Sequence, residues 1–269
     1  PAFADTYTID LREYVSPSLH PYSAIVQVGP ESGACTGTLT ADGVIVTAKH
    51  CVLDENFRTL QPKDLSVRHQ IEGPLLLGDI QASGFDIYPN MYFDTNMGVV
   101  GDWALLGPRR DVKSDVRMAK FSGNMPVDVE VVGYGALKVL SDQEIQKIRQ
   151  EYMKYLRGVS FANRLNPLNY FGGELFATTT STGVDFINRV NAGQIPNLSP
   201  DIFQDSSRLK LSRCVALADP GEEGNLIDCQ GWGGNSGGPV LLNLDGKWYL
   251  YGVAVAGFNG ISTNKSFFA

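Results

Sequence analysis

The segment Gly233-Gly234-Asn235-Ser236-Gly237-Gly238-Pro239 surrounds one serine with four glycines. Glycine adopts positive φ angles readily and lets the main chain approach a ligand closely, so this backbone can turn sharply at the serine. The N–H groups of Gly234 and Ser236 can then point at one spot beside the Ser236 hydroxyl, which is the layout of an oxyanion hole. The alternative is a glycine-rich hairpin with an incidental serine. Evidence from other residues is needed to distinguish the two interpretations.

His50 has the most constrained surroundings of the three histidines. It lies in Val46-Thr47-Ala48-Lys49-His50-Cys51, so it follows an apolar β-type run and precedes a cysteine. An imidazole exchanges a proton near neutral pH, and a general base needs a backbone that is held in this way. The alternative is an ordinary surface histidine. His20 and His69 have no comparable context and are interpreted as ordinary.

Asp102 leads directly into Trp103-Ala104-Leu105-Leu106, an apolar run that is typical of a core strand. A carboxylate at the edge of a core is costly unless it is hydrogen-bonded or ion-paired. The N–H of a catalytic imidazole is one such partner. A turn aspartate in front of a strand is the alternative.

Composition and charge limit the class of protein. The 29 glycines, 14 prolines and 43% hydrophobic residues favour a turn-rich β protein with a substantial core. The 29 acidic and 22 basic side chains are interspersed and leave no basic stripe, which argues against nucleic acid as a partner. No apolar run reaches the roughly 18 residues that indicate a bilayer span, so no membrane span is expected.

Short runs rich in β-branched residues alternate with turn residues along most of the chain. They fall at 24–28, 37–39, 44–47, 127–132 and 248–256. Such runs predict antiparallel β units. The charged stretch 107–120 is interpreted as the connection between an N-terminal β-rich part, residues 1–110, and a C-terminal one, residues 111–269.

One block has helical rather than strand periodicity. Ser141 and Glu144 form a capping-box signature in front of apolar residues at helical spacing. The pattern predicts an amphipathic helix over 142–157 and a second, short helix near 184–190. Both helices lie in a block at about 138–205 that is interpreted as an insertion.

The four cysteines form two pairs of sequence neighbours, Cys35 with Cys51 and Cys214 with Cys229. Neither pair has the C-x-x-C spacing of a zinc knuckle or a thiol redox motif. Two disulfides formed in an oxidising compartment are the favoured interpretation, and four reduced thiols in a cytosolic protein are the alternative. Four cysteines allow three connectivities, and the count alone leaves these open.

Three motifs, in this order along the chain, resemble the trypsin/chymotrypsin superfamily of serine peptidases. They are the histidine box Thr47-Ala48-Lys49-His50-Cys51, the aspartate strand Asp102-Trp103-Ala104-Leu105-Leu106 and the nucleophile loop Gly234-Asn235-Ser236-Gly237-Gly238-Pro239. The resemblance covers about 23–136 and 209–258. It implies an all-β fold of two antiparallel six-stranded β-barrels, with a helical insertion in the second barrel.

The same resemblance implies a role for each residue of the site. Ser236 is expected to be the nucleophile, His50 the general base, and Asp102 the residue that orients the histidine. It also implies a polypeptide substrate, no metal and no cofactor. The bridge between Cys35 and Cys51 matches the family disulfide that brackets the histidine.

Two departures from the animal digestive enzymes shift the resemblance toward bacterial members. Asn235 stands where the digestive enzymes carry an aspartate, and no Ile-Val-Gly-Gly start is present. Asn235 and a pairing of Cys214 with Cys229 resemble the glutamyl-endopeptidase group. A secreted or periplasmic location is expected from the two disulfides.

By the same resemblance, two short segments form the walls of the primary specificity pocket. They are Gln230, Gly231 and Trp232 on one side and Val255, Ala256 and Gly257 on the other. No aspartate among them can balance a buried Arg or Lys side chain. No histidine lies in 252–257 either, unlike the glutamate-specific relatives. A substrate with a neutral side chain is expected in this pocket.

The resemblance places the insertion next to this pocket, so we expect it to form a flap that restricts which substrates enter. The apolar face of its first helix, with Ile145, Ile148 and Tyr152, is expected to pack against the second barrel. A distal decoration that never meets substrate is the alternative.

The sequence thus predicts a secreted serine endopeptidase that hydrolyses peptide bonds through an acyl-enzyme. The rival hypothesis is a catalytically silent homologue that uses the same barrels as a binding module. Retention of His50, Asp102 and Ser236 argues against it. An esterase of the α/β-hydrolase type is disfavoured, because its serine precedes the acid and the histidine in the chain.

Overall fold

The protein is described from a computed structural model. The residues that it describes are 12–29, 35–68, 80–81, 86–89, 101–107, 114–118, 126–135, 138–158, 181–203, 205, 208–218, 225–227, 229, 234–260 and 263–268. The chain divides into two compact units. The β unit consists of Arg12–Ala136, Ser206–Phe258 and Lys265–Ala269, and the helical unit of Pro1–Leu11, Leu137–Asp205 and Asn259–Asn264.

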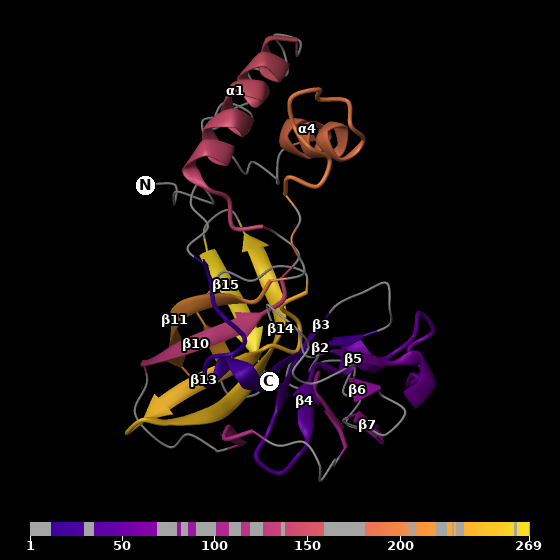
Figure 1. The fold of residues 1–269 in the computed structure, drawn as a ribbon, viewed down its shortest axis with the longest axis vertical. Coiled ribbons are helices and arrows are strands. Elements are labelled where there is room, and N and C mark those ends of the chain that lie inside the picture. Colours follow the sequence, from indigo (N-terminus) through magenta and orange to yellow (C-terminus); the bar gives the residue numbers. More distant parts are fainter. Residues whose placement is uncertain are drawn as a thin grey trace. The chain divides into compact units, whose positions relative to one another are not determined.

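The first sheet of the β unit has seven strands in the order β6-β5-β2-β3-β4-β8-β7, drawn in indigo to magenta in Figure 1. Every pairing in this sheet is antiparallel. The strands are β2 (Ile25–Gly29), β3 (Cys35–Leu39), β4 (Ile45–Thr47), β5 (Ser66–Arg68), β6 (Ile80–Gln81), β7 (Ile87–Pro89) and β8 (Ala104–Leu106). Three short 3-10 helices accompany them, η1 (Tyr22–Ala24), η2 (Lys49–Val52) and η3 (Pro62–Asp64).

The second sheet has eight strands. They are β1 (Glu13–Tyr14), β9 (Arg117–Met118), β10 (Val127–Gly133), β11 (Lys210–Ala218), β12 (Asn225–Ile227), β13 (Pro239–Leu244), β14 (Lys247–Gly260) and β15 (Thr263–Phe268). Strand β12 pairs with both β15 and β11, so the six strands β11-β10-β13-β14-β15-β12 close on themselves. Strand β1 extends the ring by pairing with β11, and β9 pairs with β14 in parallel.

This architecture confirms the predicted all-β, chymotrypsin-like fold of two β-sheet halves. The closed ring of the second sheet has the expected six strands. The first sheet differs in strand count, because the short segments β6 and β7 bring its number of strands to seven. The first sheet takes its strands from residues before 107, and apart from β1 the second takes its strands from residues after 116. The division into barrels at residues 110 and 111 stays a prediction.

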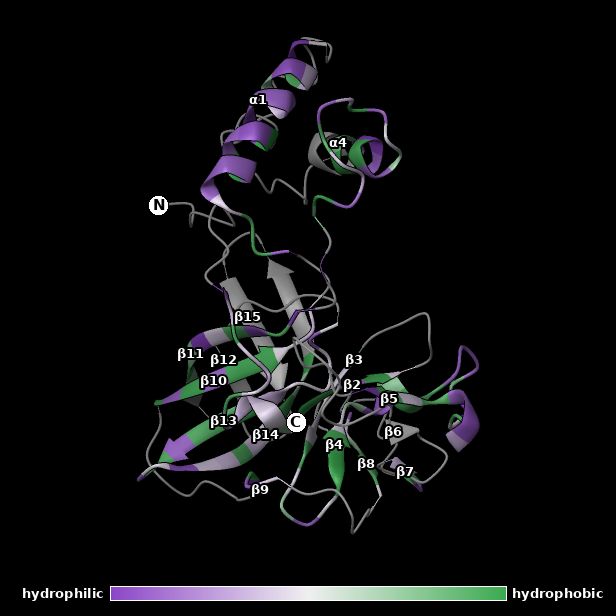
Figure 2. Cartoon of the chain, viewed as in Figure 1, coloured by the Kyte–Doolittle hydropathy of each residue, from purple (hydrophilic) through white to green (hydrophobic). Residues whose placement is uncertain are grey.

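Strands β2 and β4 are buried along their whole length, and hydrophobic residues follow one another in these and other strands of the β unit (Figure 2). In β10 and just beyond it, Val129 and Val131 pack inside the closed ring of the second sheet. Val132 and Tyr134 belong to a different core cluster, because successive side chains of a strand point to opposite faces.

That second cluster is a core shared by both sheets. It contains Ala24, Ile25, Val46, Ala48, Cys51, Val116, Val132, Tyr134, Leu209, Leu211, Leu241, Leu250, Val253 and Val255. Full burial of one such aliphatic side chain is worth about 1.5–3 kcal/mol. The two sheets are therefore held together mainly by apolar contacts, and this core lies directly beneath the segments that carry the candidate site.

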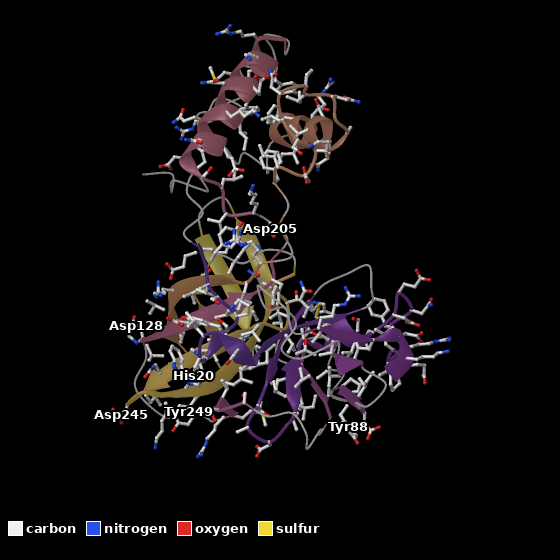
Figure 3. The ribbon with its side chains drawn as sticks, in the orientation of Figure 1. His20, Tyr88, Asp128, Asp205, Asp245 and Tyr249 are labelled. Atoms are coloured by element: carbon white, nitrogen blue, oxygen red, sulfur yellow. A yellow bond between two sulfur atoms is a disulfide. The ribbon has the colours of Figure 1, made fainter. Side chains whose placement is uncertain are left out.

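A two-residue turn joins β13 to β14. Asp245 and Gly246 both have positive φ angles, 53° and 77°, as a type I′ hairpin requires. Asp245 is labelled at the tip of this hairpin in Figure 3. Asp-Gly also occurs at Asp42-Gly43, between β3 and β4, where the sequence predicts a hairpin.

The helical unit contains α1 (Asp142–Gly158) and α4 (Ser181–Asn191), at the positions that the sequence predicts. The capping box is formed: the N–H of Ser141 donates to Glu144 Oε2 at 2.9 Å, and the N–H of Glu144 donates to Ser141 Oγ at 3.4 Å. Among the described residues, no helix is both long and apolar enough to cross a bilayer.

The apolar face of α1 packs within the helical unit. Ile148 and Tyr152 lie in one core cluster with Phe186 and Val190 of α4, and Ile145 packs against that cluster. The expectation that this face is covered by the second barrel is therefore wrong. The sequence of α1 shows that a face must be buried, but the residues that cover it, Phe186 and Val190, follow Tyr152 by more than 30 positions in the chain.

A polar contact also joins the two helices. The Tyr155 hydroxyl donates to Asp185 Oδ2 at 2.6 Å, and Arg189 donates to the same oxygen at 2.8 Å. Burial, followed by the hydrogen bond to Asp185, raises the pKa of Tyr155 to about 12. Tyr155 therefore stays a neutral donor across the physiological pH range.

Candidate active site

The register between β4 and β8 brings His50 and Asp102 together. Thr47 pairs with Ala104 in this antiparallel ladder. Continuing the register by two residues sets Asp102 opposite Lys49, one residue from His50. The helix η2 begins at Lys49, separated from the end of the strand by one residue, and its backbone turn presents the His50 side chain to this edge.

Asp102 holds His50 at two points. The His50 backbone N–H donates to Asp102 Oδ1 at 2.9 Å, and ring Nδ1 lies 2.6 Å from Asp102 Oδ2. An ionised carboxylate can only accept hydrogen bonds, so Nδ1 carries the proton and Nε2 of the neutral ring keeps its lone pair. The Asp102 side chain is 18% exposed and the His50 side chain 45% exposed, so the ring is open to an incoming molecule.

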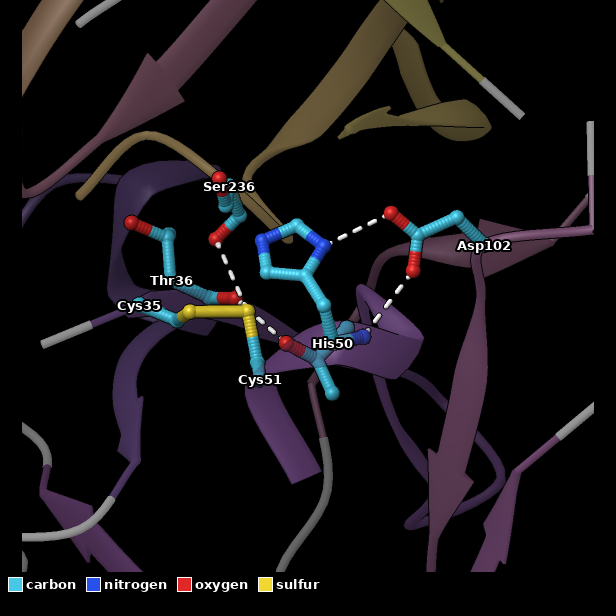
Figure 4. A network of polar contacts seen from close by, with 7 residues as sticks. Cys35, Thr36, His50, Cys51, Asp102 and Ser236 are labelled. Carbon is cyan, nitrogen blue, oxygen red and sulfur yellow. Dashed lines mark hydrogen bonds and ion pairs between the residues drawn. A yellow bond between two sulfur atoms is a disulfide. The ribbon is translucent and has the colours of Figure 1, made fainter. Parts of the chain in front are cut away.

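Ser236, from a distant part of the chain, lies at the same site as His50 and Asp102. Figure 4 shows the His50 ring between the Asp102 carboxylate and Ser236, with the second ring nitrogen on the Ser236 side. Ser236 is partly buried, in the turn that leads into β13. The three predicted triad residues are thus assembled at one site of the β unit.

The loop that carries Ser236 is tied to β14. The Gly237 N–H donates to Ala254 O at 2.7 Å, and the Ala254 N–H donates to Gly238 O at 2.8 Å. Gly234 and Gly237 have φ angles of 94° and 81°, which glycine adopts without strain. Gly234 and Gly237 are therefore required by the backbone path of the loop.

The two predicted oxyanion donors remain available. Among the described residues, neither the N–H of Gly234 nor that of Ser236 donates to another protein group. A third N–H nearby, that of Gly238, is already used by Asn235 O at 2.8 Å. Free main-chain donors beside a serine are what an oxyanion hole needs.

Both predicted cysteine pairs are bridged. Cys35 is joined to Cys51 with a Cα–Cα distance of 6.0 Å, and Cys214 to Cys229 with a Cα–Cα distance of 5.2 Å. The first bridge connects β3 to η2 directly beside His50. Donor atoms of Cys35, His50 and Cys51 lie within 4.8 Å of one another. Bridged sulfurs are not thiolates, so this group is not suited to hold a metal ion.

Sequence reasoning missed Thr36, which contacts the Ser236 loop. The Thr36 N–H donates to Ser236 O, and its hydroxyl donates to Gly234 O, each at 2.8 Å. The partners of the hydroxyl bond are 198 positions apart in the chain. The only local signal was its place next to Cys35, which is bridged to the neighbour of His50.

The predicted pocket residues fall into three groups. Gln230, Gly231 and Trp232 lie outside the described residues. Val255 is only 6% exposed and belongs to the core shared by the two sheets. Ala256 and Gly257 lie on β14, two and three residues after the segment that pairs with the Ser236 loop. The substrate-binding role of all six stays a prediction.

Of the other histidines, only His20 is among the described residues, and it is not part of the site. His20 is exposed in a turn before η1 and is labelled in Figure 3, and His69 lies outside the described residues.

Comparisons with known proteins agree with this architecture. The family model Trypsin matches residues 12–168, which is more than half of the chain. The match includes His50 and Asp102 and ends before Ser236. A comparison with curated proteins found no match. The resemblance to bacterial members in particular stays a prediction. From the family match and the two-sheet fold together, we conclude that the chain belongs to the trypsin family.

Proposed function

We propose that the protein is a secreted serine endopeptidase that hydrolyses peptide bonds through an acyl-enzyme. Ser236 is the nucleophile, His50 the general base and Asp102 the residue that orients His50. The main support is the pair of hydrogen bonds from His50 to Asp102, at 2.9 and 2.6 Å. They leave Nε2 as the proton acceptor on the side of Ser236.

The chemistry follows from these groups. As Ser236 Oγ attacks the substrate carbonyl carbon, its proton passes to His50 Nε2, and the carbonyl oxygen takes up the negative charge. The N–H groups of Gly234 and Ser236 stabilise that oxyanion. The imidazolium then gives its proton to the leaving amine as the C–N bond breaks. Water repeats the sequence on the ester, which releases the acid and restores the Ser236 hydroxyl.

Location and substrate are parts of the same proposal. The two disulfides are stable in an oxidising environment, which supports a secreted or periplasmic protein. The substrate is a polypeptide with a neutral side chain in the primary pocket, because the predicted pocket segments contain no acidic side chain to pair with Arg or Lys.

A fluorophosphonate probe tests the nucleophile directly. We expect the native protein to be labelled at Ser236, as located by peptide mass spectrometry, and to cleave an unbiased peptide library mainly after neutral residues. Ser236→Ala and heat-denatured protein are the controls and should not be labelled. A folded native protein that neither reacts with the probe nor cleaves any peptide would instead be a silent binding module.

Removing each disulfide separately tests how the site is held. The bridges close loops of similar length, with sequence separations of 16 and 15, so each is worth on the order of 3 kcal/mol in the chain-entropy model. We expect the double variants C35S/C51S and C214S/C229S to lose similar stability in urea unfolding.

Turnover should distinguish these two variants. Loss of the Cys35–Cys51 bridge should lower kcat about 10-fold more than loss of the other bridge, because it releases both η2 and β3 beside the site. Both variants are assayed at a temperature at which they are fully folded, so that a difference in kcat does not reflect unfolding. Equal kcat values would show that this bridge has no special role in catalysis.

A further inference from the structure

Thr36 is the residue of the first sheet that is most closely bound to the Ser236 loop. It is fully buried in β3. Its N–H donates to Ser236 O at 2.8 Å and its hydroxyl donates to Gly234 O at 2.8 Å. The same hydroxyl oxygen accepts the Tyr134 N–H at 2.9 Å, and the Thr36 carbonyl accepts the Thr47 hydroxyl at 2.7 Å. Figure 4 shows Thr36 beside Ser236 and the Cys35–Cys51 bridge.

These contacts hold the loop on both sides of the candidate oxyanion hole. Three successive carbonyls, those of Gly234, Asn235 and Ser236, are each hydrogen-bonded. Thr36 holds the first and the third, and the Gly238 N–H holds the middle one at 2.8 Å. A peptide plane contains both its C=O and the following N–H, so the held Asn235 carbonyl also sets the direction of the Ser236 N–H.

Cys51 Sγ also lies 3.7 Å from Ser236 O, but a bridged sulfur has no hydrogen to donate. Among the described residues, the Thr36 hydroxyl is therefore the one side-chain donor to these three carbonyls. Because the hydroxyl also accepts the Tyr134 N–H, it is anchored to the end of β10. The Gly234 carbonyl is therefore linked to the end of β10 in the second sheet through a residue of the first sheet.

We propose that Thr36 is a positioning residue for the oxyanion hole, and that its hydroxyl keeps the Gly234 and Ser236 N–H groups aimed at the reacting carbonyl oxygen. This inference rests on the proposed peptidase function. It assigns part of the control of the hole to a residue of the sheet that carries His50, so Thr36 links the two halves of the site. Thr36 itself does not touch substrate.

Thr36→Val tests the hydroxyl at nearly constant side-chain volume. The variant leaves the Gly234 carbonyl without its side-chain donor, so the loop can turn away from the productive arrangement. We expect kcat to fall by about 10- to 100-fold with KM within about twofold, because the oxyanion forms after substrate has bound. Affinity for a peptide aldehyde, which forms an oxyanion-like adduct, should fall in parallel with kcat.

Two further variants separate positioning from packing. Thr36→Ser keeps the hydroxyl and should restore most of kcat. Thr38→Val is the matched control, because Thr38 lies on the same strand, is equally buried, and its hydroxyl has no hydrogen-bond partner among the described residues. It should leave kcat and aldehyde affinity unchanged. If Thr36→Val does not fold, Thr36→Ala replaces it, since it removes the hydroxyl without adding a methyl group toward Gly234.

The outcomes separate the two proposals. Peptide turnover by the native protein establishes the function, and the difference between Thr36→Val and Thr36→Ser then tests the positioning role. The positioning role is overturned if Thr36→Val keeps native kcat, if KM rises while kcat is unchanged, or if Thr38→Val loses as much activity. A native protein without turnover overturns both proposals.

Discussion

Replacement of Ser236 by alanine is expected to lower turnover by about 10⁶-fold, and His50→Ala by a similar factor, while the protein stays folded. Both side chains lie at an accessible site rather than in a core, since Ser236 is partly buried and the His50 ring is 45% exposed. Their removal therefore eliminates catalytic groups but few packing contacts. Single-turnover kinetics and circular dichroism on the same samples measure the two effects separately.

Asp102→Asn should lower turnover by about 10⁴-fold, for a different reason. The Asp102 carboxylate accepts two N–H groups from His50. An asparagine offers one acceptor oxygen and one donor NH₂ group, so it cannot accept both. Where the NH₂ group faces the ring, Nδ1 must accept and Nε2 carries the proton, which leaves no base for Ser236.

Asp128→Asn is the control for this change, since Asp128, labelled in Figure 3, is an exposed carboxylate on β10. It should retain full activity. Native-like turnover by Asp102→Asn would remove Asp102 from the proposed mechanism, and native-like turnover by Ser236→Ala would refute the acyl-enzyme itself.

Gly237→Ala is expected to destabilise the β unit by more than about 4 kcal/mol, enough to prevent folding in most conditions. Gly237 has a φ of 81°, and a Cβ atom added there would overlap the Thr36 carbonyl oxygen and the Thr47 hydroxyl, and would lie 2.8 Å from the Ala48 nitrogen. All three neighbours belong to the buried first sheet or its end, so none of them can move aside cheaply.

Gly246→Ala provides the matched control. Gly246 has nearly the same backbone conformation, with a φ of 77°, but a Cβ atom there would meet nothing within 4 Å. The free energy of unfolding of this variant should fall by only about 1–2 kcal/mol, because alanine is strained in the left-handed conformation. Urea unfolding measures both. If the two variants prove equally stable, the close approach of the Ser236 loop to the first sheet is not a structural requirement.

The local structural features of this protein are determined by short stretches of its sequence. The capping box of Ser141 and Glu144 marks the start of α1, and it forms because its two partners are three residues apart. The glycines at 234 and 237 indicate a loop with positive φ angles, which it has. Candidates for the site also follow from local motifs, because each triad residue lies in a recognisable segment.

Contacts between distant segments were decided only by the tertiary structure. The α1 sequence shows an apolar face, yet it does not show that Phe186 and Val190 cover it, because a hydrophobic surface has no directional preference among apolar partners. The closure of the second sheet depends in the same way on β12, which pairs with strands on both sides.

At the site itself, Thr36 is the clearest example of a contact that the sequence does not reveal. Its neighbours in the sequence predict a strand next to a cysteine and nothing more. Its hydrogen bonds to Gly234 and Ser236 arise only once the two sheets pack on their shared core. The sequence by itself thus indicated several of the strands, both helices and the candidate residues, which depend on short-range chemistry. The tertiary structure alone decided which main-chain groups meet across the sheets, because those contacts depend on the packing of residues far apart in the chain.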